Sequence, residues 1–347
     1  MNAIQNYVWG LSKKQQYEET IIEITTNRNE TFKWGEVTGT VQYYDWGNGI
    51  KNNSKSHRFA NAGVHTIKIV GDITYFRFPF NDYNASLVTK IVKVASSITS
   101  FLYTFIGCTN LTTISSGLFD KNVNVTNFEG CFSRCTNLTT IPSTLFDKNV
   151  NVTSFKNCFS LCTNLTTIPS GLFDKNVNVT NFEDCFNGCT NLTTIPSGLF
   201  DKNVNVTSFK KCFYSCINLT IIPSGLFDKN VNVTDFERCF SSCENLTTIP
   251  SGLFDKNVNV TSFKNCFNLC TNLNTVPSAL FDKNVNVTDF SGCFIRCTKL
   301  TNRPKPHGLE MWQIAGTNSR PSFIHVGFMF SDCTAMPDYT SLPWSVK

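Results

Sequence analysis

The sequence predicts a repeat solenoid with a 27-residue period, a parallel β-sheet and short helical turns, preceded by a small antiparallel β-sandwich-like domain. Two observations support this prediction. Cysteines recur every 27 residues in two columns between residues 108 and 297. An earlier stretch lacks this period and carries β-prone runs between Gly and Asn turns. The predicted units are 1–19, an N-terminal segment or anchor helix; 20–86, the β domain; 87–107, an N-terminal cap; 108–300, seven repeats and the start of an eighth; and 301–347, a C-terminal capping repeat with an insert.

The β domain contains a recognisable turn. Thr20–Thr26 is rich in Thr and Ile, as β-strands are. The run Tyr44–Gly49 reads YDWGNG and is followed by the β-prone run His65–Val70. Together they resemble the PKD-type β-sandwich, whose D-W-G-D-G turn is D-W-G-N-G here. The resemblance covers this domain alone and implies a spacer or a docking unit.

The repeat unit can be followed in residues 162–188, which read CTNLTTIPSGLFDKNVNVTNFEDCFNG. Its first third is an extended run that ends at Pro169. Ser170–Lys175 fits one helical turn. Phe182, Cys185, Phe186 and Cys189 have the spacing i, i+3, i+4, i+7, which indicates one face of a helix. One such unit is too small to fold alone, so neighbouring units must stack.

The string F-x-x-C-F-x-x-C-x-x-L-x-x-I-P resembles the BspA-like leucine-rich repeats of bacterial surface and phage-borne proteins. The resemblance covers about residues 88–347. It implies a solenoid of the leucine-rich-repeat type that works in adhesion and recognition. The repeats are specific for the fold and say little about the ligand.

The sixteen cysteines are predicted to be buried thiols that fill the core. In the two caps Thr104 and Met329 occupy cysteine positions, and neither can form a disulfide. The spacing does not match a zinc site. A D-x-N-x-N run lacks the Gly and Glu of a calcium loop, so no metal and no cofactor are predicted. An Asn column that begins at Asn110 and Asn137 is predicted to satisfy buried backbone groups between coils.

The binding candidates are the positions that differ between repeats. One column alternates in charge, and the stretch around it is the most variable part of the unit. Alternating charges on neighbouring coils attract, and a changing stripe on a constant scaffold suits recognition as well as drift. The candidate residues in this stripe are Glu129, Arg134, Lys156, Glu183, Lys210, Lys211, Tyr214, Glu237, Arg238, Lys264 and Arg296. A second candidate group lies in the terminal insert and contains Arg303, His307 and Trp312.

Composition excludes several functions. The net charge of +5 is not gathered into a basic stripe, which argues against nucleic-acid binding. No apolar run is long enough for membrane insertion, and no secretory signal is recognisable at the N-terminus. The four His residues are scattered in the sequence, and no catalytic motif stands out, so no enzyme is predicted.

The sequence therefore predicts a non-enzymatic recognition protein of a phage virion, which binds a protein or glycan on a cell surface. Its N-terminal region would contact other virion proteins. Two alternatives stay open, a bacterial cell-surface adhesin of the BspA-like type and a passive structural spacer.

Overall fold

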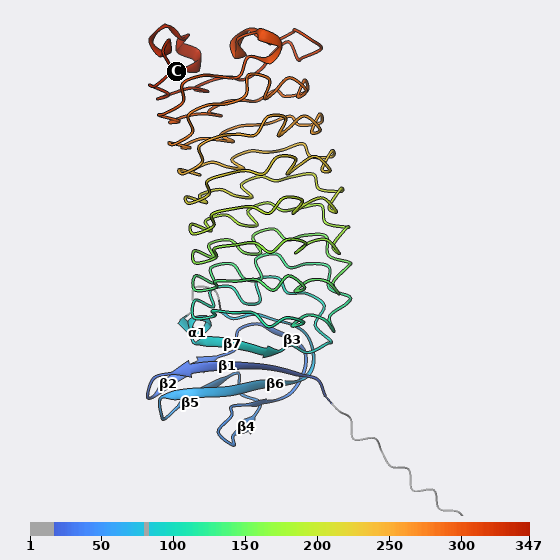
Figure 1. The fold of residues 1–347 in the computed structure, drawn as a ribbon. Coiled ribbons are helices and arrows are strands. Elements are labelled where there is room, and N and C mark those ends of the chain that lie inside the picture. The colour runs from blue at the N-terminus through green and yellow to red at the C-terminus, as the bar shows by residue number, and fades with distance from the viewer. Residues whose placement is uncertain (1–16, 80–82) are drawn as a thin grey trace, which may run out of the picture.

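The computed structural model describes residues 17–79 and 83–347, so the predicted N-terminal anchor lies mostly outside the described residues. A β domain forms one end of the molecule, and a column of stacked coils rises from it to the C-terminal insert (Figure 1). The elements are β1 (Glu19–Thr26), β2 (Glu30–Lys33), β3 (Val37–Asp45), β4 (Lys51–Asn52), β5 (Ser56–Phe59), β6 (Gly63–Phe76), α1 (Tyr83–Ser86), β7 (Val88–Lys93), and the single turns η1 (Pro306–Gly308), η2 (Met311–Gln313), η3 (Tyr339–Ser341) and η4 (Trp344–Val346).

The N-terminal domain is antiparallel, as predicted. Five strands form a sheet in the order β4-β3-β6-β1-β7, and β2 pairs with β5 in a second, two-stranded sheet. β7 hydrogen-bonds to β1, so the sheet extends past residue 86, the predicted end of this domain. The reason is that Val88 and Ile91 bury their side chains in the common core. The strand predicted for the cap of the solenoid therefore serves the sheet, and the two parts of the molecule are continuous.

The predicted turn of the β domain holds an aromatic core. Trp46 is fully buried, stacks on Tyr44 and His57, and donates its indole N–H to Asn52 Oδ1 at 3.2 Å. Asp45 Oδ1 accepts the backbone N–H of Gly47 at 3.0 Å and closes the turn. Buried aromatic pairs of this kind contribute about 0.5–1.5 kcal/mol each beyond the area they bury. The assignment of this domain to the PKD type stays a prediction.

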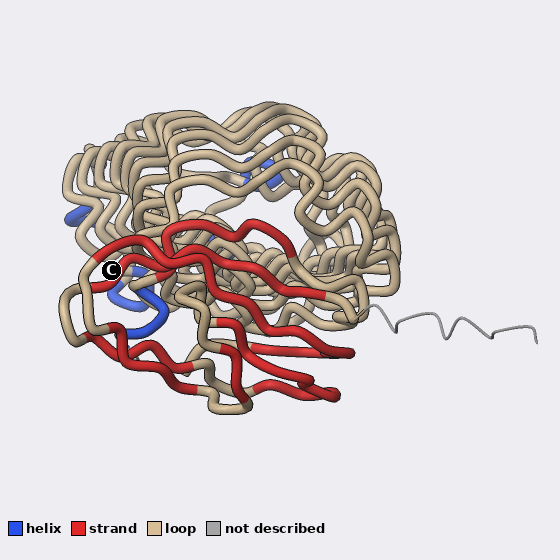
Figure 2. Tube along the Cα trace, turned by 90° about the horizontal axis from the view of Figure 1, so that it is seen from below, coloured by secondary structure: helices blue, strands red, loops and turns tan. Residues whose placement is uncertain are grey.

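Each coil of the solenoid is a series of turns, and the predicted helical segments are wrong. Along 182–189, Cys185 N–H bonds to Phe182 O at 3.1 Å, as in a turn, whereas Phe186 N–H reaches Cys212 O of the next coil at 2.9 Å. Left-handed backbone at Asp184 and Gly188 prevents a helix from propagating. The parallel sheet is present only as isolated bridges between coils, such as Asn181 to Ser208. Viewed along the axis, the coils superimpose as a ring of loops (Figure 2).

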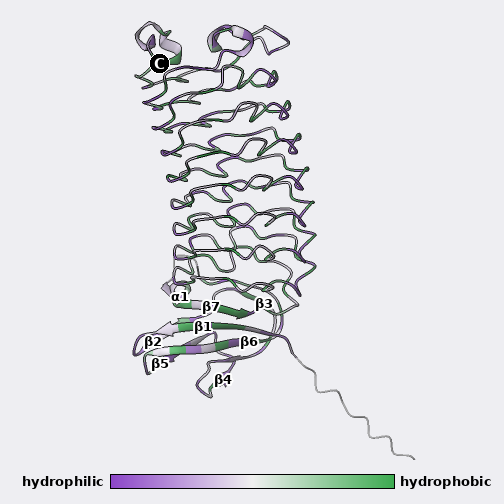
Figure 3. Ribbon diagram, in the orientation of Figure 1, coloured by the Kyte–Doolittle hydropathy of each residue, from purple (hydrophilic) through white to green (hydrophobic). Residues whose placement is uncertain are grey.

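The core of the solenoid consists of stacked columns of identical side chains. Figure 3 shows hydrophobic and hydrophilic residues alternating around every coil. Three Phe columns run through the interior, with ring centroids 5.9 Å apart for Phe155 and Phe182, 5.7 Å for Phe159 and Phe186, and 6.3 Å for Phe173 and Phe200. No unit could bury these rings alone, so stability depends on the stacking of neighbours.

The predicted burial of the cysteines is confirmed, since all sixteen are buried, and all are free thiols. One of the two columns also has a polar role. Cys189 Sγ donates a hydrogen bond to Phe159 O of the preceding coil at 3.2 Å, and the same contact recurs from Cys135 to Cys297. Burial raises the pKa of Cys189 well above its usual value. These thiols act as protonated donors within the core. In the two caps, Thr104 and Met329 occupy cysteine positions and are also fully buried, as the cysteines of the repeats are.

An Asn ladder that bonds buried backbone groups is present, but in a different column from the one predicted, which begins at Asn110. Asn164 Nδ2 bonds to Asn137 Oδ1 at 3.1 Å on the outer surface, so the column chosen from the sequence links amides to one another. The buried ladder begins at Asn122. Its member Asn203 is fully buried, and Nδ2 donates to Phe173 O at 3.1 Å and Asn176 O at 2.9 Å. This ladder satisfies backbone carbonyls between coils, the role expected for the other column.

Arg320 ends the buried ladder. Its guanidinium donates from Nη1 to Asn284 O at 3.0 Å and from Nη2 to Phe281 O at 2.6 Å. These are the carbonyls that the amide of a further Asn would contact. Desolvation lowers the pKa of this buried side chain, and Asp282 opposes the shift. The terminal insert thus closes the open end of the core.

Candidate functional site

The variable stripe coincides with two left-handed positions in every coil. We call them the first and second left-handed columns, and φ at these positions lies between 54° and 70°. The first left-handed column contains Gly130, Asn157, Asp184, Lys211, Arg238, Asn265 and Gly292. The second left-handed column contains Arg134, Leu161, Gly188, Ser215, Ser242, Leu269 and Arg296. Their variability is evident in the sequence, and their left-handed conformation is not. The glycines at three of them were the available signal.

The conformation gives the variation a physical meaning. A residue with a Cβ costs about 1–2 kcal/mol in this region, whereas glycine adopts it freely. Gly130, Gly188 and Gly292 show that glycine is accepted in both columns. Other coils nevertheless carry long side chains there, such as Lys211 and Leu269. The chain therefore places large and diverse side chains where the backbone disfavours them.

Side chains of these columns lean toward the following coil. A Cβ on Gly188 would lie 2.6 Å from Leu161 Cδ2, so the Leu161 side chain occupies the space above that glycine. A Cβ on Gly130 would meet the Tyr103 ring at 2.1 Å in the same way. The stripe is therefore a continuous surface in which each residue is covered in part by its predecessor. Tyr214 is half-buried between the two columns, while Arg134 and Arg296 are exposed.

In the charged column, ion pairs join neighbouring coils at two interfaces, with one unpaired interface between them. Lys156 Nζ lies 3.1 Å from Glu183, and Lys210 Nζ lies 2.7 Å from Glu237. The hydrogen bond to Glu237 raises the pKa of Lys210, although burial opposes the shift. Such half-exposed pairs contribute about 0–1 kcal/mol each. The predicted attraction between neighbours thus occurs at two of the interfaces.

The ends of the charged column have other partners. Glu129 Oε1 accepts a hydrogen bond from the Tyr103 hydroxyl at 2.9 Å. A residue of the cap is therefore the partner of Glu129, in the place of a lysine from the preceding coil. Arg238 Nε lies 4.0 Å from Glu237 and extends that pair into the first left-handed column. Lys264 is exposed and faces Ser291 of the next coil instead of a carboxylate. The column therefore changes from paired to unpaired charge along the axis.

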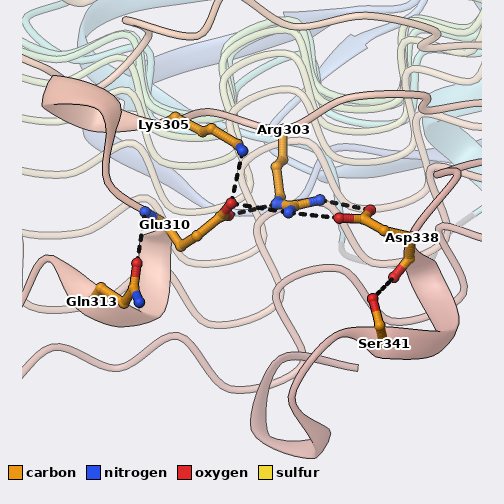
Figure 4. A network of polar contacts seen from close by, with 6 residues as sticks. All are labelled: Arg303, Lys305, Glu310, Gln313, Asp338 and Ser341. Atoms are coloured by element: carbon orange, nitrogen blue, oxygen red, sulfur yellow. Dashed lines mark hydrogen bonds and ion pairs between the residues drawn. The ribbon is translucent and has the colours of Figure 1, made fainter.

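In the terminal insert, Arg303 is a structural clasp. Its guanidinium contacts Glu310 at 2.6 and 3.0 Å and both oxygens of Asp338 at 2.8 Å, as Figure 4 shows. It also lies 5.4 Å from the centroid of Trp312. The hydrogen bonds from Glu310 and Asp338 raise the pKa of Arg303. Both carboxylates therefore hold Arg303, whose side chain is 10% exposed.

Of the other two predicted residues of the insert, one contacts this clasp and one does not. His307 is exposed with φ of 52°, and its backbone N–H bonds to Asp282 Oδ1 at 3.1 Å. Trp312 is half-buried against Arg303. The structure therefore brings Trp312 and Arg303 together and leaves His307 at the rim.

Two of the four histidines are closer than the sequence indicates. His57 and His65 flank the Phe59 ring, with centroids 4.7 and 4.1 Å away. Burial lowers the pKa of both, and the neighbouring His65 lowers that of His57 further. His65 Nε2 lies 3.0 Å from Thr26 Oγ1, and His57 Nε2 lies 2.9 Å from Asn48 Nδ2. These contacts are structural, with no carboxylate among them.

Within residues 17–79 and 83–347, no group of three or more His, Cys, Asp or Glu side chains is arranged to hold a metal ion. No helix in the same part of the chain is long and apolar enough to cross a membrane.

Solved structures resemble the chain only weakly. Toll in complex with Spätzle, from Drosophila, has a TM-score of 0.26 at 19% identity and covers 65% of this chain and 34% of its own. The TLR13–ssRNA13 complex has a TM-score of 0.29 at 13% identity, covering 72% and 48%. A leucine-rich cell-surface protein from Faecalibacterium prausnitzii has a TM-score of 0.28 at 17% identity, covering 70% and 76%. At these TM-scores the likenesses establish neither a common fold nor a common ligand.

The family comparison is more specific. No curated protein matches the sequence significantly. A family model described as a Mycoplasma protein of unknown function, DUF285, matches residues 67–198, 99–224 and 207–336. These matches overlap and include every coil of the solenoid together with β7. The chain therefore belongs to the DUF285 family.

Proposed function

We propose that this protein is a non-enzymatic recognition protein displayed on a cell surface, with the two left-handed columns as its binding surface. The observation that carries the proposal is the coincidence of variation with backbone strain. Neutral drift would favour glycine, asparagine or aspartate at left-handed positions because they cost least. Arg134, Leu161, Lys211, Arg238 and Leu269 depart from that expectation. Strained residues are retained where they contribute to function.

The constant remainder of the unit supports the same conclusion. The segment FDKNVNVT is identical in seven coils, although its Lys is exposed in all of them and its first Val in six. Variation is thus not a general property of the exposed surface in this chain. It is greatest in the stretch around the two left-handed columns, where a scaffold of stacked Phe and Cys columns holds it rigidly. Rigid presentation lowers the entropic cost of binding.

The family description supports a location on the cell. DUF285 is described from Mycoplasma, which favours a cellular protein over the virion component expected from the sequence. The resemblance to BspA-like repeats points to the same adhesin-like role. The N-terminal β domain would then act as the spacer or docking unit between the solenoid and its support.

A binding experiment with labelled protein and a panel of intact cells tests the proposal. Specific, saturable binding to one cell type is expected, and competition with unlabelled protein should abolish it. Treating those cells with protease or with glycosidases then distinguishes a protein partner from a glycan. Absence of saturable binding to every cell type would favour the passive spacer instead.

A further inference from the structure

The C-terminal end of the solenoid carries an exposed aromatic hollow, apart from the stripe on the coils. Trp344 is 87% exposed and Phe328 is 63% exposed, high values for such large apolar side chains. Together with Tyr339 they line an open hollow of about 590 Å³, which Ser331, Thr340 and Lys347 complete. Large exposed apolar patches on soluble proteins commonly mark binding sites.

Phe328 enters this hollow for a definable reason. It continues the first left-handed column, with φ of 55°, where the preceding coil has Gly292. A bulky residue is uncommon in this region and costs about 1–2 kcal/mol. Side chains of this column lean toward the following coil, as Tyr103 does over Gly130. Phe328 therefore leans beyond the last full coil, into the hollow.

The clasp of the insert holds Tyr339 in place, and Lys347 lies over the ring of Trp344. Arg303 binds both carboxylate oxygens of Asp338 at 2.8 Å, and η3, which contains Tyr339, begins at the next residue (Figure 4). The Tyr339 hydroxyl accepts the Asp332 backbone N–H at 3.0 Å. Lys347 Nζ lies 5.1 Å from the Trp344 centroid and 5.8 Å from that of Tyr339. The hollow is thus organised without a ligand.

We propose that this hollow binds a pyranose unit of a glycan. The aromatic faces would stack on the apolar C–H face of the sugar, while Ser331, Thr340 and Lys347 would bond its hydroxyl groups. An amphipathic ring ligand requires this combination of aromatic surface and a few polar groups. Lys347 is the one charged side chain of the lining, and its ammonium already donates to Thr340 O at 2.6 Å. The ammonium has two further N–H groups, which can donate to sugar hydroxyl oxygens.

The experiment is a glycan array probed with the full chain, followed by calorimetric titration with the best methyl pyranoside. Trp344→Ala and Phe328→Gly should each weaken binding about tenfold or more, which corresponds to about 1.4 kcal/mol. Phe328→Gly also removes the left-handed strain, so its unfolding temperature should stay equal or rise. Phe323→Ala is the matched control, because Phe323 is 68% exposed and lies outside the hollow.

Three results would overturn the proposal. The first is a wild-type chain that binds no glycan on the array. The second is binding that survives both Trp344→Ala and Phe328→Gly. The third is a dimer in sedimentation that Trp344→Ala converts to a monomer, because the hollow would then accept a second copy of the chain. Cell binding through the left-handed columns is independent of all three results.

Discussion

Alkaline pH should unfold this protein far more steeply than it unfolds most proteins of its size. An unfolded cysteine has a pKa of about 8.5. In the solenoid, burial raises the pKa well above the usual value for Cys131, Cys158, Cys185 and Cys212, and for the other thiols in the same direction. Above pH 8.5 the folded chain therefore holds more protons than the unfolded chain. Its stability must fall as pH rises through that range.

The magnitude follows from the number of thiols. Each buried thiol loses about 0.4 kcal/mol of stability at pH 8.5 and about 1.4 kcal/mol at pH 9.5, by proton linkage. For sixteen thiols the sum is roughly 6–7 kcal/mol at pH 8.5 and above 20 kcal/mol at pH 9.5. Domains are stable by about 5–15 kcal/mol in total. The folded state should therefore be lost between these two pH values.

Thermal unfolding in a reducing buffer, followed by circular dichroism at intervals from pH 7 to 9.5, measures this effect. The unfolding temperature should be nearly constant up to pH 7.5 and then collapse. Tyr and Lys side chains titrate near or above pH 10, so a change in stability between pH 7.5 and 9.5 is attributed mainly to the thiols. A stable unfolding temperature through pH 9 would refute the reasoning, because it would mean that the cysteines are cross-linked or exposed.

Two further predictions concern the ladder and the clasp. Asn203→Ala removes an amide that donates to two buried carbonyls, and it should lower the free energy of unfolding in urea by about 1–3 kcal/mol. The control Asn205→Ala, on the surface, should cost under about 1 kcal/mol. Equal losses in the two variants would contradict the role of the buried ladder. In the clasp, hydrogen bonds from Arg303 lower the pKa of Asp338. Burial alone would raise the pKa of Glu310, but the hydrogen bonds from Arg303 and Lys305 outweigh it and lower this pKa. The clasp therefore stabilises the cap above about pH 4 and loses this contribution as pH falls. In the wild type, protection of the backbone amides of residues 301–347 from hydrogen exchange should decrease below pH 4. In Arg303→Gln the same amides should already be poorly protected at pH 7. Normal amide protection in Arg303→Gln would show that the clasp contributes nothing to the stability of the cap.

The period and the core could be predicted from the sequence because stacking repeats every contact. Leu, Ile, Phe and Cys recur every 27 residues, and each of these columns is buried. The caps could be predicted for the same reason, since Met329 and Thr104 keep the place of a buried side chain. Periodicity reports which side chains face inward, and that information was sufficient for the solenoid.

The local backbone could not be predicted, because one spacing fits two conformations. Phe182, Cys185, Phe186 and Cys189 face one way in a helix, and equally in a chain of turns with two left-handed residues. Glycine at Gly188 was the available clue, but Leu161 and Ser215 occupy the same position in neighbouring coils and hide it. Variation between the coils thus conceals the left-handed conformation at these positions.

The candidate site was identified as a set of variable positions, and its physical character was not. Alternating charge in the column of Lys210 and Glu237 predicted their ion pair correctly. The role of Arg303 in the clasp could not be predicted, because its two acidic partners lie 7 and 35 residues away and no local pattern marks them. Arg320 was missed for the same reason, since it reaches back 36 residues to Asn284.

The central claim is that the left-handed columns exist for recognition, and one variant tests it directly. Arg134, Leu161, Lys211, Arg238 and Leu269 are replaced together by glycine, which the backbone at these positions accepts. The matched control replaces the exposed Val177, Val204 and Val231 of the constant face by Thr. We predict that the glycine variant keeps its unfolding temperature and loses saturable binding to cells, while the valine variant binds like the wild type. Undiminished binding by a folded glycine variant would contradict the claim.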